Sequence, residues 1–142
     1  MSNIEQTLSI IKPDAVERNF DNEIKQMFIK NGFYILKEKK IQIEKSEAEK
    51  FYKVHETKPF YNDLCSYLSS GPIIAMILEK ANAIVDNRKL MGATNPEEAE
   101  DGTIRKKYGI SIDKNSVHGS DSVENAKIEI DFFFKNYQIS CL

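Results

Sequence analysis

Apolar residues follow two spacings along this chain, and each spacing predicts a different kind of element. Short and almost unbroken apolar runs predict buried strands, and they lie at residues 7–11, 33–43, 73–78 and 132–134. Apolar residues three or four positions apart predict helices, over residues 22–31, from about residue 46, and over residues 60–68, 83–91 and 123–130. The expected order is strand, helix, strand, two helices, strand, helix, loop, helix and strand.

Residues with special backbone preferences indicate where these elements begin and end. Pro13 cannot donate to a sheet, so it should end the first strand, and Gly32 is expected to cap the first helix. Asp121 with Glu124 three residues later resembles a capping box, with aspartate in place of serine or threonine. Regular patterning fades over residues 92–114, and a connection of that length is usually functional or disordered.

Alternating strands and helices indicate an α/β or an α+β sandwich. The order fits best an α+β fold, a ferredoxin-like split β-α-β-β-α-β sandwich with extra helices inserted. We therefore expect a four-stranded antiparallel sheet, with the long loop directly before a turn at residues 115–122. The 142 residues contain no repeat and no Pro/Gly-rich linker, which predicts a single domain over residues 1–142.

Composition narrows the classes of protein that this chain can represent. The apolar share of 41% argues against disorder. With 20 basic and 22 acidic residues, the chain has no overall basic field for nucleic acid, so a site for a polyanion must be local. Cys65 and Cys141 lack the spacing of metal ligands, and reduced thiols are expected. Without a signal-peptide pattern or an apolar run that could span a bilayer, we expect a soluble, cytoplasmic protein and no membrane partner.

The turn predicted at residues 115–122 contains the strongest candidate for chemistry, His118. An imidazole among small and polar residues is expected to be exposed, and near neutral pH much of it is uncharged and nucleophilic. Gly119 would let a substrate approach closely, and Ser120 and Ser122 supply hydroxyl groups. On its own, a loop histidine is more often a surface residue than a nucleophile, and the signal from His55 is weaker.

Cationic residues stand where the predicted elements end. Lys12 follows the first strand, Arg88 ends a helix, and Thr94 and Arg105 lie in the long loop. Each has an ordinary explanation, because a lysine at a strand end is usually solvated and an arginine in a last helical turn complements the helix dipole. The common phosphate-binding loops and zinc motifs are absent. Composition and spacing alone therefore predict only a domain with an anion site.

Five segments taken together resemble the nucleoside diphosphate kinases. They read T-L-S-I-I-K-P-D-A-V at residues 7–16, K-P-F-Y at 58–61, M-G-A-T-N-P at 91–96, G-T-I-R at 102–105 and N-S-V-H-G-S-D-S at 115–122. The resemblance covers essentially the whole chain, and the H-G-S-D-S segment is highly specific. It implies an enzyme, a phosphotransferase that moves the γ-phosphoryl group of a nucleoside triphosphate, typically ATP, to a nucleoside diphosphate. The mechanism would be ping-pong, through a phosphohistidine at Nδ1 of His118. The enzyme would tolerate different bases and sugars and would balance nucleotide pools.

The resemblance also implies roles for individual residues. Tyr52 would lie beside the reacting phosphate, and Ser120 and Glu129 would steady the histidine. The nucleotide would be held at its phosphates by Lys12, Arg88, Thr94 and Arg105, at its base by Phe60, Leu64 and Ile112, and at its ribose by Asn115. Mg²⁺ would bind mainly through the nucleotide phosphates, so no protein metal site is expected. The family's members assemble from dimers into hexamers or tetramers, and the order of assembly stays open.

The chain departs from the family's pattern at three places, none of which is a matched catalytic position. Asp101 replaces a common proline, Arg105 is followed by Lys106 and Lys107 where an acidic residue is frequent, and Phe20-Asp21-Asn22 replaces a glycine-containing turn. Their effect on subunit contacts stays open. Two other readings are a nucleic-acid-binding module on the same scaffold, which the negative net charge disfavours, and a histidine phosphocarrier or phosphatase. We expect no nucleic acid to be required.

Overall fold

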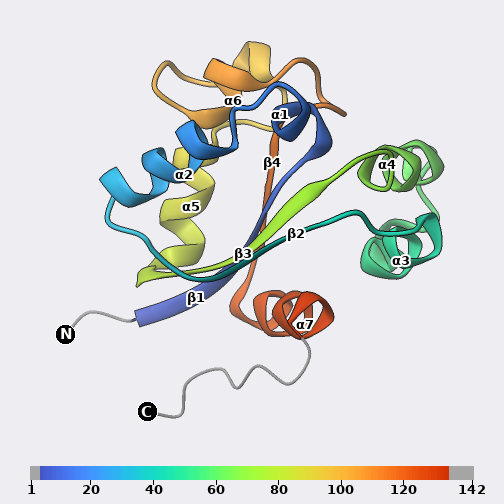
Figure 1. Ribbon diagram of the computed structural model, residues 1–142, viewed down its shortest axis with the longest axis horizontal. Helices are drawn as coiled ribbons and strands as arrows, with labels where there is room; N and C mark the ends of the chain where they lie inside the picture. Colours follow the sequence, from blue (N-terminus) through green and yellow to red (C-terminus); the bar gives the residue numbers. More distant parts are fainter. Residues whose placement is uncertain (1–3, 135–142) are drawn as a thin grey trace.

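The sheet forms the centre of the molecule in the computed structural model, which describes residues 4–134. Its four strands are antiparallel and lie in the order β2-β3-β1-β4 (Figure 1). This is the strand order of a ferredoxin-like fold, as the sequence predicts. The strands are β1 (Ile4–Ile11), β2 (Tyr34–Ile41), β3 (Ile73–Ala81) and β4 (Val117–Gly119).

Helices cover both faces of the sheet. One face carries α1 (Pro13–Glu17), α2 (Asp21–Lys30), α5 (Ala83–Met91) and α6 (Ile104–Tyr108). The other face carries the extra helices, α3 (Lys45–Phe51), α4 (Tyr61–Leu68) and α7 (Val123–Phe133) (Figure 1). Two 3-10 helices, η1 (Lys53–His55) and η2 (Pro96–Glu98), complete the described elements. Across residues 4–134, no helix is long and apolar enough to cross a membrane.

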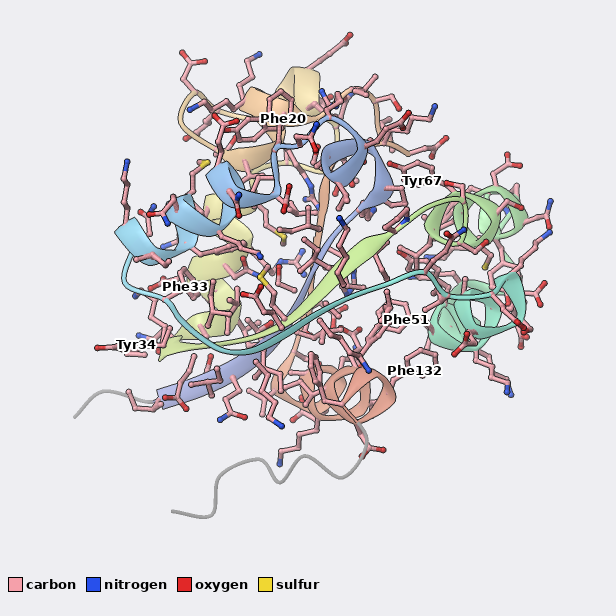
Figure 2. All side chains as sticks on the ribbon, in the orientation of Figure 1. Phe20, Phe33, Tyr34, Phe51, Tyr67 and Phe132 are labelled. Atoms are coloured by element: carbon pink, nitrogen blue, oxygen red, sulfur yellow. The ribbon has the colours of Figure 1, made fainter. Side chains whose placement is uncertain are left out.

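Two hydrophobic cores result from this arrangement, one on each face of the sheet. Strand β3 contributes to both, because successive side chains of a strand point to opposite faces. Ile74, Met76 and Leu78 join the core under α2 and α5, while residues 73, 75 and 77 join the core under α3, α4 and α7. Burial on both faces explains why this strand reads as a continuous apolar run. Phe51 and Phe132, with ring centroids 5.5 Å apart, close the second core between α3 and α7 (Figure 2).

The prediction of a last strand at residues 132–134 is wrong. Phe132 and Phe133 belong to α7, which Phe134 follows as its C-cap residue. Phe133 is buried in the same core as Ile130, so the helical spacing of apolar residues continues through this segment. The fourth strand is instead β4, in the segment for which the sequence predicted a turn.

The predicted helix ends and the long loop agree with the structure only in part. The N-cap of α7 is Ser122, whose hydroxyl accepts from the backbone N–H of Asn125, so the capping box predicted at Asp121 is not formed. The long loop contains η2 and α6, and Pro13 both ends β1 and opens α1, at a position where its missing N–H is not needed. Gly32 has φ of +87° just after α2, as expected for a cap. Cys65 is a buried free thiol, while Cys141 lies outside the described residues.

Candidate active site

A pocket of about 680 Å³ opens where the end of β1, strand β4 and the helices α3 to α7 meet. Every site residue predicted from the sequence lines this pocket except Ser120, which lies directly behind Glu129. These residues come from segments that are far apart in the chain. The pocket-lining members are Lys12, Tyr52, Phe60, Leu64, Arg88, Thr94, Arg105, Ile112, Asn115, His118 and Glu129.

His118 lies on β4 opposite Ile10, with its side chain 20% exposed, so the expectation of an exposed turn residue is wrong. Its Nε2 is 2.9 Å from Oε1 of Glu129 on α7. Because an ionised carboxylate can only accept, Nε2 must carry the proton in this contact. The lone pair of the neutral ring is then on Nδ1, to which no described residue donates a hydrogen bond. The arrangement leaves Nδ1 as the nucleophilic atom.

Ser120 links the carboxylate of Glu129 to the sheet. Its hydroxyl donates to the same Oε1 at 2.7 Å and accepts from the backbone N–H of Leu8 at 3.2 Å. Two donors, one from the histidine and one from the serine, thus hold one carboxylate oxygen. Glu129 is positioned by this pair, and the orientation of the imidazole follows from it.

Aromatic rings enclose the other sides of the imidazole. Phe51 meets it edge to face with centroids 5.3 Å apart, and Tyr52 does so at 6.5 Å. Burial raises the pKa of the Tyr52 hydroxyl, and the nearby Cys65 and Glu129 raise it further. The phenol therefore stays protonated and can donate a hydrogen bond to an anion in the pocket.

Lys12 is buried rather than solvated, contrary to the expectation for a strand end. Its Nζ donates to Oδ1 of Asn115 at 2.9 Å. Burial, with the charge of Arg105 as the second cause, lowers the pKa of Lys12 to about 8. A desolvated cation that is bonded to a neutral amide has free capacity to attract a phosphate group.

The two arginines of the site have different surroundings. Arg105 is buried and donates to the carbonyl oxygens of Gly92 at 3.0 Å and Val117 at 2.9 Å. Burial and the neighbouring charge of Arg88 lower its pKa to about 10. Arg88 is exposed and forms no ion pair among residues 4–134. Three cations therefore face one cavity, which makes a strong anion site.

The opposite wall of the pocket is apolar and open. Phe60 is 43% exposed and Ile112 is 55% exposed, although both line the cavity with Leu64. His55 lies behind Phe60, with centroids 6.1 Å apart, and its pKa is lowered by burial and by Lys58. Exposed apolar side chains that line a cavity are typical of a ligand site.

Gly119 also has a packing role. A Cβ at this position would lie 2.3 Å from Nδ2 of Asn87 and 2.8 Å from Cε of Met91. The glycine therefore lets α5 pack closely on β4, and it lines the pocket as well.

Among the pocket-lining residues to which sequence reasoning assigned no site role are Phe51, His55, Asp121 and Asn125. Asp121 and Asn125 are four residues apart, and Nδ2 of Asn125 donates to Asp121 at 2.6 Å. That bond is the main cause that lowers the pKa of Asp121. The helical spacing of the two polar residues was the available signal.

The described residues contain no group of three or more histidine, cysteine or acidic side chains that could hold a metal by itself. The carboxylates that line the pocket are those of Asp113, Asp121 and Glu129, and Glu129 is already bonded to His118 and Ser120. This donor set fits a hard cation that takes most of its oxygen ligands from phosphate groups and water.

Known proteins provide an independent comparison. The family model for nucleoside diphosphate kinase matches residues 5–139. A nucleoside diphosphate kinase of Geobacter sp. (strain M21) is 54% identical over 136 residues, which are 96% of this chain and 99% of that protein. One from Persephonella marina is 52% identical over 96% of this chain and 97% of that protein. The crystal structure of the Aquifex aeolicus nucleoside diphosphate kinase superposes with a TM-score of 0.93 at 39% identity, covering 94% of this chain and 97% of that one.

Proposed function

The chain belongs to the nucleoside diphosphate kinase family and is a phosphotransferase that acts between nucleotides; on that premise we propose that His118 carries the phosphoryl group. The proposed route is ping-pong, from a nucleoside triphosphate to His118 and from His118 to a nucleoside diphosphate. The observation that supports it best is the 2.9 Å contact between Nε2 of His118 and Glu129, inside a pocket with three cations. In the cell, the enzyme is expected to balance nucleotide pools.

In the first half-reaction, the lone pair on Nδ1 of His118 forms a bond to the γ-phosphorus. The bond from that phosphorus to the oxygen bridging the β- and γ-phosphates breaks, and its electron pair leaves with the nucleoside diphosphate. The proton on Nε2 stays in its hydrogen bond to Glu129, which stabilises the positive charge that develops on the ring. In the second half-reaction, a terminal oxygen of another diphosphate attacks the same phosphorus and Nδ1 leaves.

Phosphoryl transfer needs positioning and charge neutralisation more than covalent help from the protein. We propose that Lys12, Arg88 and Arg105 neutralise the phosphate oxygens and that Thr94 donates its hydroxyl to them. Tyr52, as a protonated phenol, would donate to the transferred group. Mg²⁺ fits the same pocket through the nucleotide phosphates, with Asp121 as the candidate protein oxygen, and it would supply charge neutralisation there.

Base recognition is proposed to depend on ring stacking and apolar contact. Phe60 would stack on the base, with Leu64 and Ile112 on its other side. Every base has a π-face, so this contact tolerates purines and pyrimidines alike. Asn115, whose amide lies between Lys12 and the carbonyl of Thr94, would contact the ribose hydroxyls. Deoxynucleotides should then be used, whereas dideoxy analogues should be poor substrates.

The proposal includes a homo-oligomer built from dimers. Strand β2 is an edge strand of the sheet, and an uncovered edge readily pairs with another chain. Its Tyr34 is 72% exposed and points away from the molecule (Figure 2). Leu36 on the same strand is 38% exposed. We expect the enzyme to act in the cytoplasm, because nucleoside triphosphates are available there.

The proposal is tested by measuring exchange from ATP to GDP with the wild type, His118→Ala and His55→Ala. Wild-type protein and His55→Ala should be labelled by γ-³²P-ATP with an acid-labile, base-stable bond, whereas His118→Ala should not. Label that persists undiminished in His118→Ala would refute the mechanism. Nucleic-acid binding across a salt series without exchange activity would instead support a binding module, and ATP-independent labelling or net phosphate release a phosphocarrier or phosphatase.

A further inference from the structure

Directly before the β4 strand that carries His118, the backbone adopts an uncommon conformation. Ser116 has φ of +72° and is fully buried. The backbone N–H of Val117 donates to the carbonyl of Asn115 at 2.9 Å, so the chain makes a three-residue turn centred on Ser116. A turn of this kind with positive φ is strained for any residue other than glycine. Something in the surroundings must therefore hold it.

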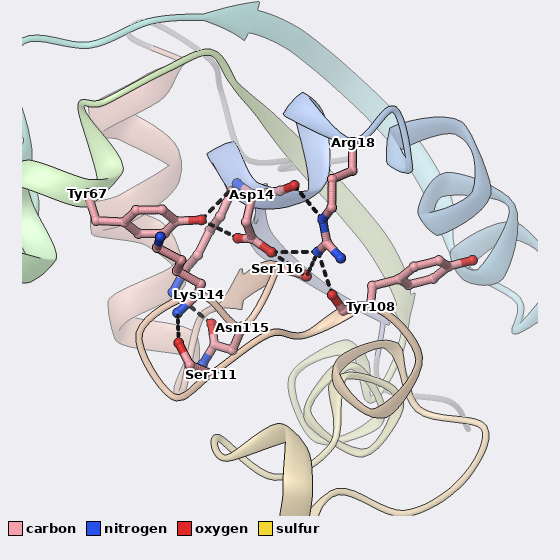
Figure 3. A network of polar contacts seen from close by, with 9 residues as sticks. Asp14, Arg18, Tyr67, Tyr108, Ser111, Lys114, Asn115 and Ser116 are labelled. Carbon is pink, nitrogen blue, oxygen red and sulfur yellow. Dashed lines mark hydrogen bonds and ion pairs between the residues drawn. The ribbon is translucent and has the colours of Figure 1, made fainter.

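The hydroxyl of Ser116 donates to Oδ2 of Asp14 at 2.7 Å (Figure 3). On the other side of the residue, the carbonyl of Ser116 accepts from the backbone N–H of Lys12 at 2.8 Å. These bonds hold the strained residue from both its side chain and its backbone. The hydroxyl also accepts a longer hydrogen bond from Arg18, at 3.5 Å. The shorter bond joins Ser116 to Asp14 across 102 positions of the chain.

Asp14 is itself rigidly oriented. Its carboxylate is buried and also accepts from the Tyr67 hydroxyl, and from Arg18 at 3.0 Å (Figure 3). Arg18 donates further to the carbonyl of Tyr108. Tyr67 belongs to α4 and Tyr108 to α6, the helices that carry Leu64 and Arg105 to the pocket. One carboxylate therefore joins three walls of the site.

We propose that Asp14 is a positioning residue for phosphoryl transfer, which keeps Ser116 in its left-handed conformation through the Ser116 hydroxyl. The residue before Ser116 is Asn115, and His118 follows two positions later, so a change at Ser116 would rotate both relative to Lys12. Asp14 does not line the pocket, and it would act without touching the nucleotide. This inference rests on the proposed function, because it concerns the placement of His118 as phosphoryl acceptor.

The test compares two substitutions that remove the same hydroxyl. Ser116→Ala leaves a Cβ that disfavours positive φ, whereas Ser116→Gly makes positive φ accessible without a penalty. At saturating ATP, the rate of His118 phosphorylation should fall roughly tenfold in Ser116→Ala, because the alanine Cβ disfavours positive φ and the hydroxyl that held this conformation is gone; that factor corresponds to about 1.4 kcal/mol. In Ser116→Gly it should fall by less than about threefold.

Asp14→Asn completes a double-mutant cycle. Asp14 accepts hydrogen bonds from three donors, whereas an asparagine amide offers them only one acceptor oxygen. In the wild-type background, this substitution should therefore slow phosphorylation roughly tenfold. Combined with Ser116→Gly, it should slow it by less than about threefold, because glycine no longer needs the carboxylate. Rapid-quench ³²P labelling gives the rates, and circular dichroism checks that all five proteins are folded at the assay temperature.

Equal losses in Ser116→Ala and Ser116→Gly would overturn the proposal, and so would an Asp14→Asn effect of the same size in both backgrounds. Wild-type exchange from ATP to GDP is measured in the same preparations. If the wild type is active but Ser116→Gly is slowed as much as Ser116→Ala, only the positioning role fails. If the wild type itself accepts no phosphoryl group, the proposed function fails as well.

Discussion

Replacing Lys12 with methionine probes the physical basis of the anion site. Lys12 is buried beside Arg105, and its Nζ donates to an uncharged amide oxygen. Its pKa is lowered by burial to about 8 in the folded protein, compared with 10.5 for an ordinary lysine. The folded protein therefore loses this proton at a lower pH than the unfolded chain, and holding the charge destabilises the unliganded fold. A bound phosphate group would remove that penalty.

The magnitude follows from the difference between the two pKa values, about 2.5 units. At about 1.4 kcal/mol per unit, a charged Lys12 destabilises the unliganded fold by about 3 kcal/mol below pH 8. As pH rises from 8 to 10.5, the unfolded chain binds more protons than the folded one, so this penalty disappears. The free energy of unfolding, wild type minus Lys12→Met, should thus increase by about 3 kcal/mol across that window.

Urea unfolding of both proteins, followed by circular dichroism at one protein concentration, measures this difference. Taking the difference cancels the other groups that titrate in the same range. A second measurement is proton uptake on ADP binding near pH 8, from calorimetry in buffers of different ionisation enthalpy. The wild type should take up protons there because phosphate raises the pKa of Lys12, and Lys12→Met should take up fewer. A difference in unfolding free energy that stays flat with pH would refute this reasoning.

Three further substitutions test separate parts of the site. Glu129→Gln should lower kcat at least roughly tenfold with little change in KM, because it removes the carboxylate that orients His118. Stopped-assay kinetics measure kcat and KM, and an unchanged kcat would contradict the orienting role of Glu129. Phe60→Ala should raise KM for purine and pyrimidine nucleotides alike, because about 1–3 kcal/mol of stacking energy is lost. Phe60→Tyr, the control, should leave KM unchanged. A rise in KM for one base alone would argue against stacking. Gly119→Ala should lower the free energy of unfolding, measured in urea, by about 1–3 kcal/mol, because its Cβ would clash with Asn87. Gly71→Ala is the control, since its Cβ would lie 3.6 Å from Pro13. Equal losses in the two variants would contradict the packing argument.

The parts of the fold that the sequence predicts correctly are those with a local cause. The run at residues 73–78 reads as a buried strand because both faces of β3 are covered. The helix over residues 83–91 and the cap at Gly32 follow from spacing and from glycine's backbone freedom. The error at residues 132–134 arises because three consecutive apolar residues suit a strand and a helix equally well. Only packing on Ile130 decides between them.

The geometry of the site could not be read from the sequence for a different reason. The burial of Lys12 and the contact between His118 and Glu129 depend on elements that meet only in the folded chain. The bond from Ser116 to Asp14 joins residues 102 positions apart. The three residues 117–119 are compatible with a turn as well as with a strand. They form a strand because they pair with β1. Family resemblance identified the residues, but their hydrogen bonds and burial required the fold.

A single-turnover chase shows whether His118 carries a phosphoryl group between two nucleotides. Protein labelled with γ-³²P-ATP is separated from nucleotide and then mixed with unlabelled GDP. The label should leave the protein and appear in GTP in equal amount, and His118→Ala should never be labelled. Label that stays on the protein, or that is released as inorganic phosphate instead of GTP, would contradict it.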